Sequence, residues 1–190
     1  MADLTTLRRS PLAHLADQLA AGSVPGTVEL REAAYTGMVS LRVDPAGPAA
    51  ERVAAVLGAR LPTRCGDVAS NVLWLGPDEW LVVTDADAVA LTDQLAAAVG
   101  EEAGLAIDVS ANRTVLELTG ASARAVLEKG CPLDLHPRTF TPGRAVTTTL
   151  ARIPVLLWQT GETSYRLLPR SSFADYVARW LLDAMTEFSG

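Results

Sequence analysis

Two histidines and two cysteines are the side chains in this sequence whose types most often act as nucleophiles, bases or metal ligands. His14 lies off the apolar face of its segment and His136 lies in a proline-rich loop, so neither has a nucleophile or an orienting acid nearby in the sequence. Cys65 and Cys131 lack CxxC or any other metal-ligand spacing, which indicates small buried thiols in a reducing compartment. We therefore predict no catalytic, cofactor-binding or metal-binding residue in this chain.

Two pairs of reactive side chains are close in the sequence, but their positions argue against chemistry. Lys129 could activate the thiol of Cys131, although burial of the cysteine behind a helix end is the interpretation that we favour. Asp78 and Glu79 are of the type that performs acid and base catalysis. Because neighbours in a strand point to opposite faces, these two carboxylates cannot share a substrate, and we expect them to shape a turn.

Aromatic residues are the remaining candidates for ligand binding. Trp74, Trp80 and Trp158 could stack on a flat ligand such as a pterin or a flavin. Strand aromatics belong more often to the core, which is what we expect here. The sequence contains no GxGxxG, P-loop or HExxH motif, so it gives no local support for dinucleotide binding, phosphate binding or zinc-dependent hydrolysis.

The elements that must position these residues occur twice in the chain. A strand, a helix and an aromatic hairpin extend from Met38 to Val83, and the same order returns from Arg113 to Leu168. A further helix follows each hairpin. The duplicated order of strand, helix, strand, strand and helix predicts an α+β fold with two pseudo-symmetric halves.

Within this repeat, Trp74 corresponds to Trp158, and Trp80 corresponds to Tyr165. We expect the two matched tryptophans to be equivalent core residues of the two halves. The segment from Ser110 to Asn112 is a turn between the last strand of the first half and the first strand of the second. This continuity predicts that the two halves share one hairpin and have joined sheets.

The N-terminal segment is predicted to be a helix followed by an extended arm. Ser10 and Pro11 are residues that begin helices, and one apolar face follows them, comprising Leu12, Leu15 and Leu19. The arm contains one short strand and continues from Glu29 to Met38. We divide the chain into this segment (1–37), a first α+β repeat (38–110) and a second α+β repeat (111–190), which form one compact unit.

Capping signals mark two later helices. Asp85 or Asp87 is expected to cap the helix that ends the first half. In the last helix, Ser172 and Asp175 resemble a capping box. This helix is predicted to have one continuous apolar face formed by Phe173, Tyr176, Val177, Trp180, Leu181 and Ala184.

Composition narrows the classes of partner. The formal charge is −6, and the arginines are scattered singly, so we expect no nucleic-acid binding. Hydrophobic residues make up 49% of the chain, yet no run approaches the roughly 18 apolar residues that a membrane helix needs. We also see no secretory signal and expect a cytoplasmic protein. The mean hydropathy of +0.21 predicts that a protein partner covers some apolar surface.

Several segments, in order, resemble the gamma subunit family of heterotetrameric sarcosine oxidase. These are RSPL, SLRVDP, LGPDEWLVV, the run ANRTVLELTGASARAVLEKGCPLDLHPRTFTPG, and YRLLPRSSFADYVARWLLDA. The resemblance extends over nearly the whole chain. It implies a fold similar to the folate-binding aminomethyltransferases of the glycine cleavage system, which are built from two ferredoxin-like repeats placed side by side.

The same resemblance implies membership of a four-subunit flavoenzyme complex. Such a complex oxidatively demethylates sarcosine to glycine, transfers the one-carbon unit to tetrahydrofolate and reduces oxygen to hydrogen peroxide. FAD, FMN, NAD, tetrahydrofolate and zinc are expected on the alpha, beta and delta subunits. The present chain is then expected to be a non-catalytic assembly subunit that contacts chiefly alpha. We expect the contact to involve exposed members of the apolar face of Leu12, Leu15 and Leu19, and the arm from Glu29 to Met38.

An alternative stays open from the same resemblance. A free-standing protein of this fold could bind folate and transfer one-carbon units, or maintain iron-sulfur clusters. Proteins of the latter kind carry KGC followed by an aromatic residue and GQE, whereas Pro132, Leu133 and Asp134 follow KGC here. This difference weighs against iron-sulfur maintenance.

Overall fold

The first half of the chain is a five-stranded antiparallel sheet with two helices. The structure is a computed structural model, and it describes residues 8–188. The strands lie in the order β3-β4-β5-β2-β6. Their bounds, with those of the two helices, are β2 (Gly37–Val43), α2 (Pro48–Leu57), β3 (Val68–Ala69), β4 (Val72–Gly76), β5 (Glu79–Thr84), α3 (Ala88–Val99) and β6 (Gly104–Asp108).

The second half has a sheet of the same kind, with strands in the order β1-β7-β10-β9-β8. Its elements include the N-terminal ones, and short 3₁₀ turns flank α1 and α5. The bounds are η2 (Ala13–Leu15), α1 (Ala16–Ala21), β1 (Glu29–Glu32), β7 (Leu116–Thr119), α4 (Ala123–Glu128), β8 (Arg144–Leu150), β9 (Ile153–Gly161), β10 (Ser164–Pro169), η3 (Ser171–Phe173), α5 (Ala174–Met185) and η4 (Thr186–Phe188).

The two sheets match strand for strand, because β8, β9, β10, β7 and β1 repeat the order of β3, β4, β5, β2 and β6. The predicted α+β fold with two pseudo-symmetric ferredoxin-like repeats is therefore confirmed. One strand departs from chain order: β1, from the N-terminal arm, occupies the edge of the second sheet that β6 occupies in the first. The predicted shared hairpin is wrong, since β6 and β7 lie in different sheets.

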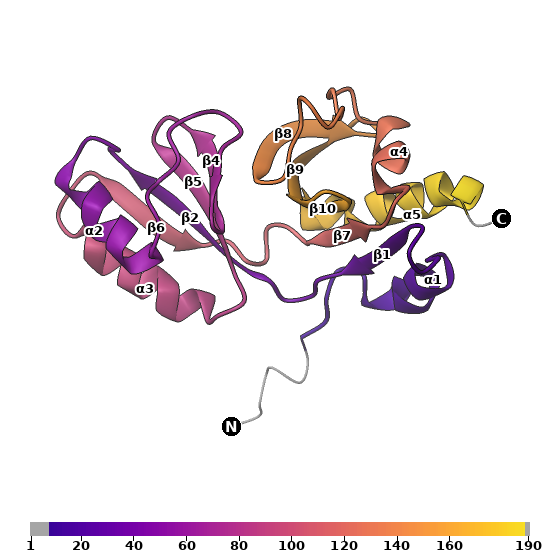
Figure 1. Ribbon diagram of the computed structural model, residues 1–190. Coiled ribbons are helices and arrows are strands. Elements are labelled where there is room, and N and C mark those ends of the chain that lie inside the picture. Colours follow the sequence, from indigo (N-terminus) through magenta and orange to yellow (C-terminus); the bar gives the residue numbers. More distant parts are fainter. Residues whose placement is uncertain (1–7, 189–190) are drawn as a thin grey trace.

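Three apolar clusters hold four layers together (Figure 1). Helices α2 and α3 cover one face of the first sheet, and α1, α4 and α5 cover one face of the second. The uncovered faces meet each other. There, Met38, Leu73 and Leu81 of the first sheet join Leu156 and Trp158 of the second in one buried cluster. The order of layers is thus helix, sheet, sheet, helix.

Helix capping follows the sequence prediction at one helix and departs from it at another. Asp87 caps α3, with its Oδ1 accepting hydrogen bonds from Val89 N at 2.9 Å and Ala90 N at 3.3 Å. The capping box at α5 is wrong, because α5 begins at Ala174 after a 3₁₀ turn and has no side-chain cap. Asp175 instead contacts the side chains of His14 and Arg179, which lie outside the first turn of α5.

The apolar face of α5 is also narrower than predicted. Phe173 and Tyr176 are 40% and 49% exposed. The buried residues of the helix are Ala174, Val177, Ala178, Leu181, Ala184 and Met185. Within the described residues, no helix is long and apolar enough to span a membrane.

The four hairpin aromatics do not all match as predicted. Trp80 and Tyr165 are equivalent, since both are fully buried beneath the helices of their own half. Trp74 lies opposite Trp80 and packs on the same side. Trp158, however, lies opposite Arg166, and Tyr165 lies opposite Gln159. This one-residue shift turns Trp158 to the other face, between the sheets.

Candidate functional site

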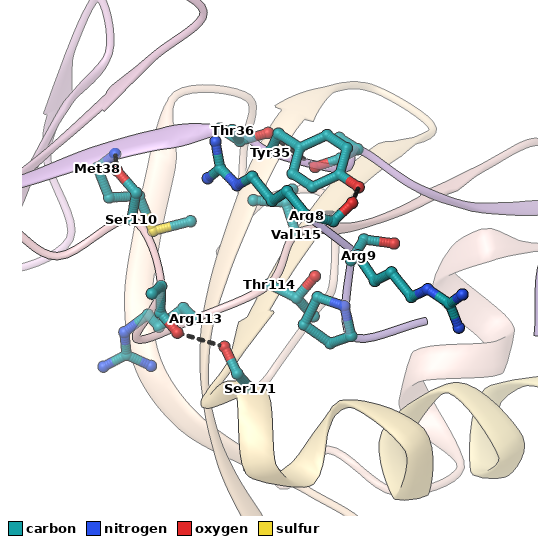
Figure 2. A pocket seen from close by; sticks show the side chains of 14 residues that line it. Arg8, Arg9, Tyr35, Thr36, Met38, Ser110, Arg113, Thr114, Val115 and Ser171 are labelled. Carbon is teal, nitrogen blue, oxygen red and sulfur yellow. Dashed lines mark hydrogen bonds between the residues drawn. The ribbon is translucent and has the colours of Figure 1, made fainter. Parts of the chain in front are cut away.

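The two halves are joined by two crossing segments, and a pocket lies between them. Residues 33–36 lead from the second sheet to the first, and residues 109–115 lead back. Together with residues 8–11 of the N-terminal segment they enclose a pocket of about 270 Å³ (Figure 2). We call it the junction pocket.

A carboxylate holds the N-terminal segment at this pocket. Glu32, at the end of β1, accepts hydrogen bonds from the hydroxyls of Ser10 at 2.6 Å and Thr114 at 2.7 Å. It also accepts one from the backbone N–H of Leu12 at 3.3 Å. Three parts of the chain that are distant in sequence are thereby tied to one side chain.

The other hydroxyls of the junction pocket also have fixed acceptors. Ser110 donates to Asp108, Thr36 donates to Ala33 O at 2.8 Å, and Ser171 donates to Ala111 O at 2.8 Å. The side-chain and backbone hydrogen bonds from Ser110 lower the pKa of Asp108. None of these acceptors is a histidine or a lysine, so none of these hydroxyls is arranged as a nucleophile beside a general base.

Arginines give the pocket its charge. The guanidinium of Arg8 lies 4.7 Å from the ring centroid of Tyr35, whose hydroxyl donates to Arg8 O at 2.8 Å (Figure 2). Arg113 donates to Leu168 O at 2.8 Å, and burial, with the nearby charge of Arg170, lowers its pKa. The arrangement is suited to holding the two halves together and to presenting positive charge, and it has no set of groups for proton transfer.

The histidines named by the sequence lie outside this pocket. His14 Nε2 is 2.7 Å from Asp175 Oδ1, an exposed contact that ties the N-terminal segment to α5. His136 lies in the exposed loop between α4 and β8, where its Nδ1 accepts a hydrogen bond from the backbone N–H of Arg138 at 3.2 Å. The structure does not bring these two residues together as a site.

The cysteines also stay apart. Cys131 is buried, as predicted, with its Sγ 3.9 Å from Thr148 Oγ1. Cys65 is exposed, so the prediction that it is buried is wrong. Lys129 does not serve the thiol: its Nζ donates to Ala184 O at 2.6 Å and lies 2.6 Å from Glu187 Oε2. Lys129 therefore fixes the end of α5.

The carboxylate pair lies at the hairpin turn between β4 and β5, where it was expected. Asp78 Oδ2 accepts a hydrogen bond from Arg42 NH2 at 2.9 Å, an exposed pair. Among residues 8–188 no group of three or more His, Cys, Asp or Glu side chains is placed to hold a metal ion.

Sequence reasoning missed one buried charge, at Glu117. Its side chain is only 9% exposed, and it lies between Arg31 of β1 and Arg166 of β10. Arg166 NH2 is 2.8 Å from Glu117 Oε1, and the Arg166 guanidinium lies 5.4 Å from the ring centroid of Trp158. The available signal was the position of Glu117 between two leucines in LELT. Alternate residues of a strand point to opposite faces of the sheet, so this glutamate lies on the face opposite the leucines.

Known proteins match this chain in sequence along most of its length. The model of the sarcosine oxidase gamma subunit family matches residues 42–187. The sarcosine oxidase subunit gamma of Corynebacterium sp. (strain U-96) is 51% identical, over 100% of this chain and 95% of its own length. That of an Arthrobacter species is 51% identical over 97% of this chain and 93% of its own length.

Two solved structures are similar. A chain of the heterotetrameric sarcosine oxidase from Corynebacterium sp. U-96, in complex with pyrrole 2-carboxylate, aligns with a TM-score of 0.93 at 51% identity, covering 97% of each chain. The glycine cleavage system aminomethyltransferase T from Bartonella henselae aligns with a TM-score of 0.67 at 15% identity, covering 93% of this chain and 57% of that one, which shows a shared fold. The family resemblance seen in the sequence is confirmed. This chain belongs to the sarcosine oxidase gamma subunit family.

Proposed function

We propose that this chain is a non-catalytic assembly subunit of a heterotetrameric sarcosine oxidase. The observation that carries the proposal is the end-to-end likeness, at a TM-score of 0.93, to a chain of such a complex. The junction pocket agrees with the proposal, because its hydroxyls and the half-buried Arg113 all hold segments of the same chain.

The complex would supply the chemistry on other chains. We propose that FAD, FMN, NAD, tetrahydrofolate and zinc belong to the alpha, beta and delta subunits, that alpha is the main contact of this chain, and that the assembly is cytoplasmic. Sarcosine would be demethylated to glycine there, with transfer of the one-carbon unit to tetrahydrofolate.

The apolar face of the N-terminal helix is not available to a partner, whereas the arm from Glu29 to Met38 stays a proposed contact, since Tyr35 is 51% exposed. Leu12, Leu15 and Leu19 are at most 3% exposed, because they pack in the core of the second half. Exposed apolar side chains lie instead on the edge strand β6, where Leu105 is 39% and Ile107 is 50% exposed. The equivalent edge strand β1 carries charged residues, which protect an edge from pairing.

Co-expression of the four subunits with and without this chain tests the proposal. We expect that omitting the chain prevents recovery of the alpha subunit in an intact complex, measured by native mass spectrometry, and reduces sarcosine-dependent formation of hydrogen peroxide. A fully assembled and active complex without this chain would contradict it. Calorimetry of the isolated chain with tetrahydrofolate addresses the alternative, since micromolar binding would favour a free-standing folate protein.

A matched pair of substitutions tests the contact surface. Ile107→Asp places a charge on the β6 edge and is expected to weaken binding to alpha at least tenfold. Val56→Asp, on α2, is the control, because Val56 is 37% exposed and lies on a different helix from α3, which packs beside β6. Equal affinities of the two variants would exclude β6 from the interface.

A further inference from the structure

An exposed apolar row on the edge strand β6 leads to a small pocket between the two halves. Leu105, Ile107 and Val109 alternate along this edge, so their side chains share one face of the first sheet. Val109 continues the pairing with β2, since its N–H donates to Met38 O at 2.8 Å. Val109 packs against the cluster between the sheets, whereas Leu105 and Ile107 are 39% and 50% exposed. The second sheet therefore leaves this part of the face uncovered.

The pocket at the end of this apolar row has a volume of about 140 Å³, and we call it the arginine pocket. Val109 lines it together with Ser40 of β2, which is the register partner of Ile107. Arg113 of the crossing segment and Arg170, which follows β10, also line it. The volume is below the range of about 300–1,000 Å³ that is usual for small-molecule sites. A pocket of this size has room for one side chain of a partner.

The two arginines of this pocket are held by neutral acceptors. Arg113 NH1 donates to Leu168 O at 2.8 Å, and Arg170 NH1 donates to Asn112 Oδ1 at 3.1 Å. Within residues 8–188, neither arginine forms an ion pair with a carboxylate. A guanidinium has five N–H donors, so each of the two retains donors for a further acceptor. Arg170 is exposed and Arg113 is half-buried, so a partner can reach the pocket.

The charges around the arginine pocket favour the addition of a carboxylate. Burial and, after it, the positive charge of Arg170 lower the pKa of Arg113, so the two cations lie close enough to repel each other. Glu79 also lines the pocket, but in the described part of the chain it forms no ion pair with either arginine. Asp108, at the end of β6, accepts hydrogen bonds from Ser110 instead. A carboxylate from outside the chain would relieve the repulsion between the arginines and bind to both.

We propose that the arginine pocket and the apolar row of β6 bind one acidic segment of the alpha subunit. An aspartate or glutamate of that segment lies between Arg113 and Arg170, and its apolar side chains pack on Leu105 and Ile107. The proposal rests on the assembly role proposed above and adds the chemistry by which the partner is recognised. A protein segment fits better than a free anion, because only a chain can occupy both the pocket and the apolar row. Arginines beside apolar area are also enriched at protein interfaces.

Zero-length cross-linking in the assembled four-subunit complex tests the proposal. Lys129 is the single lysine of the chain, so Arg170→Lys introduces a side-chain amine at the pocket and keeps the positive charge. A water-soluble carbodiimide joins this amine to a carboxylate in contact with it, and the water that is lost converts the carbodiimide to a urea. We expect an amide with an aspartate or glutamate of the alpha subunit, identified by peptide mass spectrometry. Arg138→Lys, in the exposed loop between α4 and β8, is the control and should give no such amide.

Competition for the partner measures how much the arginine contributes to affinity. The parent chain and a variant are mixed in equal amounts with a limiting amount of the other three subunits, and native mass spectrometry gives the ratio in which they enter the complex. Arg170→Gln should enter about tenfold less than the parent chain, because a charge-assisted contact is lost. Arg138→Gln removes the same charge elsewhere and should enter equally. Salt at about 0.5 M should reduce the disadvantage of Arg170→Gln, since it screens an exposed charge.

The outcomes separate this proposal from the assembly role. Failure of the parent chain to enter the complex would contradict both. If the parent chain enters, equal competition by Arg170→Gln and Arg138→Gln would overturn the arginine pocket alone. The same holds if the introduced amine is joined only to Glu79 of its own chain, or to a subunit other than alpha. With equal competition, a rise in the unfolding midpoint with inorganic phosphate that is seen in the parent chain and lost in Arg170→Gln would assign the pocket to a free anion.

Discussion

Glu117 is the carboxylate through which three strands of the second sheet are joined by charge. It is nearly buried and contacts Arg31 of β1 and Arg166 of β10, while β7 itself lies between these strands. A buried charge is stable only with such partners. Glu117→Gln keeps the shape and removes the charge, and we expect it to lower the free energy of unfolding by about 1–3 kcal/mol. Urea unfolding of the full chain measures this loss.

Arg31→Gln is the control for Glu117, because the Arg31 side chain is 72% exposed and water can replace its contact. We expect a loss below about 1 kcal/mol, as for other exposed ion pairs. If both substitutions cost the same, the buried carboxylate is not the centre of the cluster.

Asp175 should make stability depend on pH. The hydrogen bond from Arg179, followed by that from His14, lowers the pKa of this carboxyl below its ordinary value of 3.8. A lowered folded-state pKa stabilises the fold fully above the unfolded pKa, and this stabilisation is lost as the pH falls through the folded pKa. Urea midpoints measured from about pH 5 to pH 3 should fall less steeply in Asp175→Asn than in the parent chain.

Asp183→Asn is the matched comparison for Asp175, since Asp183 is an exposed carboxylate further along α5. Comparing the two variants separates loss of the contacts with His14 and Arg179 from loss of one negative charge. If the urea midpoints of Asp175→Asn and of the parent chain fall in parallel with pH, the contacts of Asp175 with His14 and Arg179 do not contribute to stability.

Individual residues also show what the sequence could predict. The burial of Trp80 and Cys131 followed from their types and positions. The face of Trp158 did not, because a spacing of seven residues to Tyr165, against six from Trp74 to Trp80, reverses a strand face and depends on the bulge in the hairpin.

At the scale of elements, two predicted caps provide a direct comparison. Asp87 accepts two backbone hydrogen bonds at the start of α3, whereas Ser172 lies within the 3₁₀ turn before α5 and caps nothing. We expect Asp87→Ala to cost about 1 kcal/mol of unfolding free energy, a usual value for a lost cap. Ser172→Ala should cost less than about 0.5 kcal/mol. Thermal or urea unfolding measures both losses of unfolding free energy. Equal losses in the two variants would mean that Ser172 does cap α5.

Most strands were predictable, but their pairing was not. Alternation of residue types predicted strands in the two segments, Met38 to Val83 and Arg113 to Leu168, that contain β2, β4, β5, β9 and β10, because alternation depends only on neighbours in the chain. Pairing depends on distant segments. β1 lies beside β7, with Glu29 opposite Thr119 and Leu30 opposite Leu118, and nothing local to either strand specifies that contact. The same limit explains why a hairpin between β6 and β7 was predicted wrongly.

In the whole molecule, the N-terminal segment is a structural part of the second half. Its apolar residues Leu12, Leu15, Leu19, Val28 and Leu30 are all at most 3% exposed and lie in one cluster with α4 and α5. Glu32 then ties the same segment to Ser10 and Thr114 at the junction pocket. A strand from the beginning of the chain thus completes the second sheet, and β6 is the edge strand with exposed apolar side chains.

Removal of residues 1–36 should therefore unfold the second half rather than merely weaken contact with a partner. Burial of each large apolar side chain contributes about 1.5–3 kcal/mol, so loss of five of them approaches the whole stability of a domain, about 5–15 kcal/mol. We expect the truncated chain to lose the cooperative unfolding transition of the second half. Fluorescence of Trp158 and Trp180 reports this transition in a variant with Trp74 and Trp80 changed to Phe.

Adding the peptide of residues 8–36 in excess should restore that transition, because it supplies β1 and the buried leucines without a covalent link. The peptide with Leu15→Ala and Leu30→Ala is the control and should restore it poorly. A truncated chain with an unchanged transition would show that the second sheet is complete without β1.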